Sequence, residues 1–322
     1  MSDRFPPGRF LTLVAALAVL SLARTASATV ETLYDNDTKG MVPGSRGTDR
    51  NYTYGLHSAW YGRPGELPRW ADRIARRLGG AGPGAERRLS FRAGQELYTP
   101  DALSRRAPIF NDRPYAAWLF AAATISNSDS RRSRSLEVRA GVVGPDALGQ
   151  ELQTWWHLNQ HIRLPRGWQY QLANEPGLCA TLDQRWRPWG VRRMADLVPH
   201  VRVTAGNVLT EAAAGATVRV GLPIADDFGP GAPSGPEGAV HGTRLYAFAR
   251  AEGRYVARDI FLDGNTFTPS MHVTRIPDVA EFQWGFVARR GAVGLRYTFS
   301  HTTRQFAERD YHHEYGSIGL SF

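Results

Sequence analysis

The chain of 322 residues has very little cysteine and very little lysine. Its single cysteine, Cys179, excludes an intramolecular disulfide, so strand pairing and packing must hold the fold together. Lysine occurs only at position 39, and arginine supplies the rest of the 39 basic residues, against 30 acidic ones. Arginine binds phosphate through a planar fork, so an arginine-rich exported surface suits anionic lipid headgroups. A GC-rich genome that encodes lysine as arginine would give the same composition.

A long hydrophobic run is also missing. The apolar segment 10–23 is shorter than the roughly 20 residues of a membrane-spanning helix, follows two arginines, and precedes the small residues at 26–28. This pattern predicts a secretory signal peptide over residues 1–28 and a single domain over 29–322. Removing the peptide leaves a formal charge of +7 of the original +9. The predicted export argues against nucleic acid as a partner and leaves two classes, a soluble exported protein and an outer-membrane barrel.

Alternating apolar and polar residues occupy most of the remaining chain. Twelve segments alternate, and many are longer than the five or six residues of an average globular strand. Long alternating strands joined by tight turns and long polar loops are typical of a transmembrane barrel, and the C-terminal Phe322 resembles the terminal assembly signal of such barrels. We therefore predict an all-β fold, an antiparallel barrel of about 12 strands in the bacterial outer membrane. A soluble β-sandwich would explain the alternation but not the strand length. The predicted strands are 30–37, 52–61, 89–98, 113–126, 135–143, 168–184, 198–207, 211–222, 245–262, 282–290, 291–303 and 315–322.

The region 144–177 contains the clearest helix, which we place in a loop near the outer leaflet. Gln153, His157 and His161 recur every four residues and share one face in a helix. The opposite face would carry Leu148, Leu152, Trp155 and Trp156. Such a helix suits the boundary between protein and lipid, with His157 as the reactive centre. The alternative is that both histidines are ordinary surface residues.

Two segments contain more polar and charged residues than a passive barrel would need. Asn36 and Asp37 end the first predicted strand, and segment 48–55 begins the second, so several carboxylate and amide oxygens meet at one hairpin. Calcium prefers hard oxygen ligands, although Asn and Asp are also common turn residues. Arg105 and Arg106 lie in an outward loop, where they could bind a phosphate or form a solvated loop tip. The sequence has no Gly-x-Ser-x-Gly nucleophile motif and no nucleotide-binding loop.

Taken in order, the motifs resemble those of the LpxR family of outer-membrane lipid A deacylases. The order is NDT, TDRNYTYG, YTP, RR, NDRPYAAWL, GVVGPDALGQ, QTWWH and GWQYQLANEPG, densest over 35–177. The resemblance implies a twelve-stranded barrel with its site between the wall and a loop helix. It also implies a calcium-dependent hydrolase that removes the 3′-linked acyloxyacyl chain from lipid A of lipopolysaccharide.

The resemblance also implies site residues. It places the family's polar residues on Asn36, Asp37, Thr53, Gln153 and His157, and its basic pair on Arg105 and Arg106. The family's basic pair often begins with lysine, and some relatives have an acidic residue shortly after the histidine, which segment 161–166 lacks.

These residue types can perform ester hydrolysis. A neutral imidazole can activate water, and calcium can face the developing oxyanion, so we assign His157 as general base and Asp37 as a metal ligand. Asn36, Thr53 and Gln153 would position the ion, the water or the histidine. Thr53 as a covalent nucleophile ranks below activated water, because no activating motif adjoins it.

The expected partners are lipid A and outer-membrane lipid, and we expect a monomer. Two other functions remain open at this stage, an outer-membrane phospholipase and a passive porin-like channel.

Overall fold

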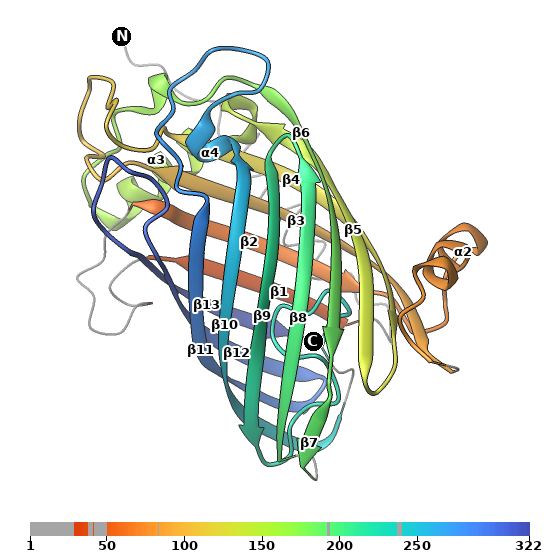
Figure 1. The fold of residues 1–322 in the computed structure, drawn as a ribbon. Helices are drawn as coiled ribbons and strands as arrows, with labels where there is room; N and C mark the ends of the chain where they lie inside the picture. The colour runs from red at the N-terminus through yellow and green to blue at the C-terminus, as the bar shows by residue number, and fades with distance from the viewer. Residues whose placement is uncertain (1–28, 38–40, 42–49, 83, 192–193, 237–239) are drawn as a thin grey trace.

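The computed structural model describes residues 29–37, 41, 50–82, 84–191, 194–236 and 240–322. The predicted signal peptide lies outside these residues. Twelve strands form a closed antiparallel barrel, in which β1 pairs with β13 and β6 pairs with β8 (Figure 1). A three-residue strand, β7, only extends the pairing of β8. The strands are β1 Thr29–Asn36, β2 Asn51–Tyr61, β3 Glu86–Thr99, β4 Ala116–Ser128, β5 Arg132–Val143, β6 Glu175–Trp186, β7 Trp189–Val191, β8 Ala195–Gly206, β9 Leu209–Gly221, β10 Val240–Asp259, β11 Asp278–Gly291, β12 Val293–Thr302 and β13 His313–Ser321.

The twelve-stranded barrel predicted from alternation is therefore confirmed. Segment 168–184 differs from the prediction at its start, because Trp168–Tyr170 forms a 3-10 turn (η2) before β6 begins. Segment 245–262 differs at its end, where Ile260–Asp263 forms the short helix α4. The connection between β2 and β3, predicted as a loop, contains helix α2 (Arg69–Leu78). The described part of the chain contains no helix that is both long and apolar enough to cross a bilayer.

The two ends of the barrel differ. The start of β1, the end of β13 and α2 lie at one end of the barrel. Helix α3 (Gly149–Gln160) and α4 lie at the other end (Figure 1). Single-chain outer-membrane barrels have short periplasmic turns and longer extracellular loops. Because the connections at the α3 end are on the whole the longer ones, including 144–174 and 260–277, that end is the extracellular end.

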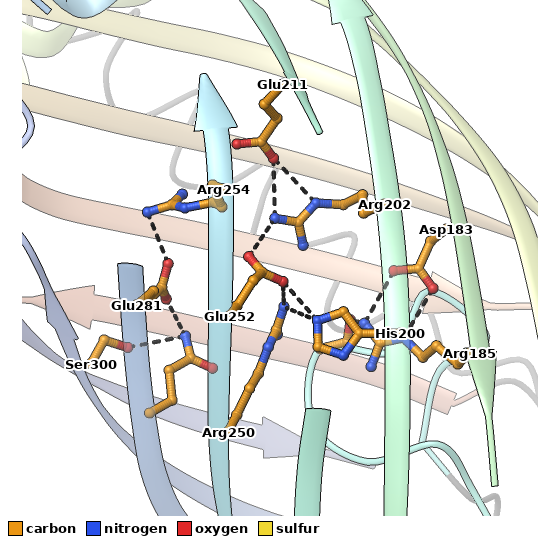
Figure 2. Close-up of polar contacts among 12 residues, drawn as sticks. Asp183, Arg185, His200, Arg202, Glu211, Arg250, Glu252, Arg254, Glu281 and Ser300 are labelled. Atoms are coloured by element: carbon orange, nitrogen blue, oxygen red, sulfur yellow. Dashed lines mark hydrogen bonds and ion pairs between the residues drawn. The ribbon is translucent and has the colours of Figure 1, made fainter. Parts of the chain in front are cut away.

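The outer wall is apolar and the interior is charged, as the alternation requires. Glu252 of β10 lies 2.7 Å from His200 Nε2 and accepts a hydrogen bond of 2.8 Å from Arg202, both of β8. Figure 2 shows these residues converging inside the barrel with Arg185 of β6 and Glu211 of β9. Apolar side chains on the same strands are exposed on the outer wall, among them Leu178, Leu182, Val201, Val203, Val218 and Val220.

Parts of the chain itself enter both mouths of the barrel. At the extracellular mouth, the ring of Phe261 in α4 stacks on Tyr98 with 3.9 Å between centroids. At the periplasmic mouth, the β9–β10 connection enters the barrel, where Phe228 packs on Val198 and the Gly231 carbonyl accepts a hydrogen bond from Arg185. A cavity of about 340 Å³ lined by charged side chains remains between the two.

Candidate functional site

Helix α3 packs on the outside of the barrel wall. Leu152 of α3 and Trp168 of η2 form a buried cluster with Leu97 and Ala117, which are outward-facing residues of β3 and β4. Gly149 permits this close approach, because a Cβ at that position would lie 2.5 Å from the Cβ of Ala117. A loop helix therefore lies against the outer wall, where the sequence predicts the candidate site.

The faces of α3 differ from the prediction. Leu152, Gln153 and His157 are all buried against the protein, whereas Trp155 and Trp156 are 47% and 38% exposed. The predicted grouping of Leu152 with the tryptophans was therefore wrong. On a membrane barrel the lipid-facing side of a helix must be apolar, so the polar side chains turn toward the wall.

His161 does not belong to the helix face at all. It follows the last helical residue in a left-handed conformation, with φ of 55°, and its side chain is exposed. The prediction that His161 shares a helix face with His157 was wrong, because the helix ends at Gln160. Leu148 likewise precedes the helix, with φ of 60°.

His157 is buried and its ring orientation is fixed by the main chain. Its Nδ1 lies 2.5 Å from the carbonyl oxygen of Arg163. A carbonyl can only accept a hydrogen bond, so Nδ1 donates its proton and the lone pair of the neutral ring lies on Nε2. The orienting group is a backbone carbonyl, and this arrangement suits a base that takes a proton at Nε2.

Gln153 lies one helical turn before His157 and is 4% exposed. Its Oε1 accepts a hydrogen bond of 2.8 Å from the indole nitrogen of Trp168. Within the described residues its buried Nε2 makes no hydrogen bond. The side-chain amide therefore offers an oriented donor to a bound molecule.

Thr53 occupies a β-bulge. In the pairing of β2 with β3, Tyr52 opposes Tyr98 and Tyr54 opposes Leu97, so Thr53 has no opposite residue. Its hydroxyl lies 2.6 Å from that of Thr99, and both side chains are buried. The bulge changes the direction of the side chain at this position, a role that alternation alone does not reveal.

Asn36 and Asp37 lie at the extracellular end of β1 and are buried. The ring of Tyr34, two residues earlier, contacts the edge of Tyr54, which itself packs on the cluster beneath α3. Because alternate residues share a face, Asn36 lies on the same outer side of the wall. Asp37 Oδ2 accepts a hydrogen bond of 2.7 Å from the backbone nitrogen of Arg50.

Thus Asn36, Thr53, Gln153 and His157 lie on the side of the wall that α3 covers. Arg105 and Arg106 lie in the β3–β4 connection and are exposed. Two hydrogen bonds join this connection to the segment after α3, one from Arg166 N to the Leu103 carbonyl and one from Gln169 to the Arg106 carbonyl.

The donor set at the β1–β2 hairpin fits a hard cation. Asp37 supplies a fully buried carboxylate, and Asn36 and Thr53 supply neutral oxygens. Asn51, which the sequence did not single out, has φ of 65° and a buried Oδ1 without a hydrogen bond in the described part of the chain. Within the same residues, no group of three His, Cys, Asp or Glu side chains could hold a metal. A calcium ion here would therefore depend on one carboxylate and several neutral oxygens, which calcium accepts.

The sequence matches the family described as "Outer membrane protein LpxR" over residues 10–322. The chain belongs to the LpxR family. Among solved structures it is similar to LpxR from Salmonella typhimurium, with 23% identity, a TM-score of 0.76, and 91% of this chain and 99% of that chain covered. This likeness confirms the fold.

More distant barrels also match. The NanC porin has 6% identity and a TM-score of 0.39, with 92% of this chain and 99% of that chain covered. The translocator domain of NalP from Neisseria meningitidis has 9% identity and a TM-score of 0.36, with 98% and 95% covered. The search of curated proteins found no match. Membership in the LpxR family and the barrel fold confirm an outer-membrane location for this chain.

Proposed function

We propose that the protein is a calcium-dependent carboxylic ester hydrolase that removes the 3′-linked acyloxyacyl chain of lipid A. The observation that carries the proposal is the buried His157, whose Nδ1 is bound to the Arg163 carbonyl so that Nε2 can accept a proton. This base lies between α3 and the outer wall, at the end where lipopolysaccharide occupies the outer leaflet. In this proposal a lipid would approach the base sideways from the membrane.

In this mechanism His157 Nε2 takes a proton from a water molecule as the water attacks the ester carbonyl. The same nitrogen then returns the proton to the departing 3′ oxygen, so the products are the free acyloxyacyl acid and a lipid A with a 3′ hydroxyl. Gln153 Nε2 would donate a hydrogen bond to the water or the substrate. Calcium, held by Asp37 with Asn36 and neighbouring neutral oxygens, would supply positive charge facing the oxyanion.

The role of Thr53 follows from its surroundings. Its hydroxyl contacts Thr99, which is not a base, and so activated water remains preferable to attack by Thr53 itself. Thr53 would instead position the ion or the water. Arg105 and Arg106 are exposed beside the α3 segment, where they can bind the phosphates of lipid A.

Two observations bear on the alternatives. A passive channel needs an open lumen, whereas α4 and the β9–β10 connection each place side chains inside a mouth of this barrel. A phospholipase would use the same base, but the exposed arginine pair favours a substrate with more phosphate charge than a zwitterionic phospholipid carries. We propose that the enzyme acts as a monomer.

Mass spectrometry of lipid A from cells that express the protein tests the proposal. The mass of the 3′ acyloxyacyl group should be lost from lipid A when calcium is present. Insertion is checked in the same cells by the shift of the folded barrel on unheated gels. An unchanged lipid A spectrum with correctly inserted protein would contradict the proposal, and release of fatty acid from phospholipids would support the phospholipase instead.

A further inference from the structure

Helix α2 lies on the outer wall at the periplasmic end, and its exposed face is basic. Its buried face consists of Ala71 and Ala75, which pack with Leu89 of β3 and Ile125 of β4. These two strand residues face outward, because the alternate residues of the same strands fill the interior. The helix is therefore attached to the outside of the barrel, remote from α3 (Figure 1).

Polar contacts fix α2 in this place. Asp72 forms an ion pair with Arg87 of β3, with 2.6 Å between Asp72 Oδ1 and Arg87 Nε. At the helix C-terminus, Arg134 of β5 donates a hydrogen bond of 2.8 Å to the Leu78 carbonyl, and Asn127 of β4 donates one of 3.1 Å to the Gly79 carbonyl. The helix is thus held by packing and by three strands, so its outward face has a defined direction.

The outward face carries a row of three arginines. Arg69, Arg73 and Arg77 follow one another at intervals of four residues, directly opposite the buried Ala71 and Ala75. All three are exposed, and within the described residues no carboxylate pairs with them. Trp70 lies beside this row and is 54% exposed.

The outer wall around α2 shows at which depth the helix lies. On the membrane side of Leu89, the exposed Phe91 stacks on Trp60 with 5.8 Å between ring centroids, and such aromatic pairs mark the edge of the hydrocarbon region. On the other side of Leu89, the outer wall becomes polar at Arg87 and Arg134. The helix therefore lies where the hydrocarbon gives way to headgroups.

We propose that α2 binds the phosphate groups of anionic phospholipids in the periplasmic leaflet of the outer membrane. Arginine forms two-pronged hydrogen bonds with phosphate, and three arginines without acidic partners on one face make an uncompensated positive surface. Trp70 would lie among the headgroups, as tryptophan commonly does. This site is independent of the hydrolase site, which lies at the opposite end.

The test measures which lipids the purified, folded protein retains. The protein is equilibrated in mixed micelles with equal amounts of phosphatidylglycerol and phosphatidylethanolamine, and native mass spectrometry gives the ratio of the two lipids bound. Wild type should retain phosphatidylglycerol in excess. The variant R69Q/R73Q/R77Q should lose about tenfold or more of that preference, since each basic residue contributes about a fivefold attraction to anionic lipid. High salt should weaken the wild-type preference in the same direction.

Two further variants make the result specific. R131Q/R132Q/R290Q removes three exposed arginines at the β4–β5 turn and at the periplasmic ends of β5 and β11, and should keep the wild-type ratio. R69K/R73K/R77K keeps the charge without the fork and should keep most of the preference. A wild type without preference for phosphatidylglycerol, an unchanged R69Q/R73Q/R77Q variant, or an equal loss in the R131Q/R132Q/R290Q control would each overturn the proposal. The shift on unheated gels confirms that every variant is folded.

Discussion

The barrel has two helices attached to its outer wall, and their outward faces are opposite in character. Both helices pack small or aliphatic side chains against apolar residues of β3 and β4. Outward, α3 presents Trp155 and Trp156, whereas α2 presents a row of arginines. The buried side of each helix determines where it is attached to the barrel. The residue types on its exposed side depend on whether that side faces the hydrocarbon or the headgroups of the membrane.

The comparison predicts that changes near α3 affect catalysis, whereas changes near α2 affect the attachment of that helix or its binding of lipid and leave catalysis unchanged. The largest effect should come from His157. His157→Ala and His157→Gln should each lower turnover of lipid A by about a hundredfold to ten-thousandfold, the usual contribution of a general base. Folding should not change, because the strand ladder holds the barrel. Turnover is measured by mass spectrometry of the released acyl chain.

His161→Ala is the matched control, since His161 is exposed and lies beyond the helix. It should keep most of the activity. Wild-type turnover should also fall toward acid pH, because a protonated imidazole cannot accept a proton from water. If His161→Ala were inactive and His157→Ala active, the assignment on α3 would be wrong. If both remained active, Thr53 would be the next residue to test.

The second largest effect concerns the metal. A calcium chelator should lower turnover by about a hundredfold to a thousandfold and added calcium should restore it, whereas Asp37→Ala should lower it similarly without recovery in calcium. The barrel should still migrate as a folded species, since strand pairing does not depend on an ion. Asp310→Ala removes a carboxylate that is 99% exposed in another extracellular loop and should have no effect. Full turnover in chelator would remove calcium from the mechanism.

The third effect concerns the arginine pair. R105Q/R106Q should raise KM more than it lowers kcat, because each charge-assisted contact with phosphate contributes about 1.5 to 3 kcal/mol to binding. R105K/R106K keeps the charge but loses the planar fork, so it should lie between wild type and R105Q/R106Q. Equal turnover of phosphorylated and dephosphorylated lipid A by wild type would contradict this role.

A smaller effect is expected at Trp168. Trp168→Phe removes the hydrogen bond to Gln153 Oε1 and leaves an aromatic ring in the buried cluster. A neutral hydrogen bond contributes about 1 kcal/mol, so kcat should fall about fivefold with little change in KM. Trp156→Phe, on the lipid face of the same helix, should leave kcat unchanged. Equal kcat values for the two variants would show that Gln153 needs no orientation by Trp168.

The smallest effect should be the pH dependence of α2. The hydrogen bond from Arg76 and the charges of Arg76 and Arg87 hold the pKa of Asp72 below its usual value. A lowered carboxyl pKa stabilises the folded state above the unfolded pKa, and this stabilisation is lost as pH falls through the folded pKa. Amides of α2 should therefore exchange faster in acid, after correction for intrinsic rates, whereas Asp72→Asn should remove this dependence. Lipid A turnover of Asp72→Asn should equal that of wild type.

The barrel could be predicted from the sequence because the alternation of apolar and polar residues is visible within each strand. A strand that faces lipid on one side and a polar lumen on the other must alternate, so segments such as 198–207 and 211–222 are visible without a structure. Helix α2 was missed because its buried face depends on the small residues Ala71 and Ala75, which add little hydrophobic signal. The face of α3 was misjudged because a soluble helix turns its apolar side inward, whereas a helix on a membrane barrel turns it toward lipid.

The site was predictable only in part. Its residue types came from motif resemblance, and their catalytic roles stay predictions. The Arg163 carbonyl could not be inferred, since any residue type supplies the same backbone group. The bulge at Thr53 and the left-handed Asn51 depend on the register between β2 and β3, which alternation does not specify.

The charged lumen has a consequence for how the barrel assembles. Glu252, Arg202 and Arg250 occupy positions that alternate with lipid-facing residues on the same strands. A strand that entered the bilayer alone would expose such charges to hydrocarbon, at about 2 to 4 kcal/mol for each arginine at the midplane. Arg250 and Glu252 pair within β10, but Arg202 of β8 reaches Glu252 only when β8, β9 and β10 are side by side. Pairing of the strands before or during their entry into the membrane therefore costs less free energy than insertion of each strand alone.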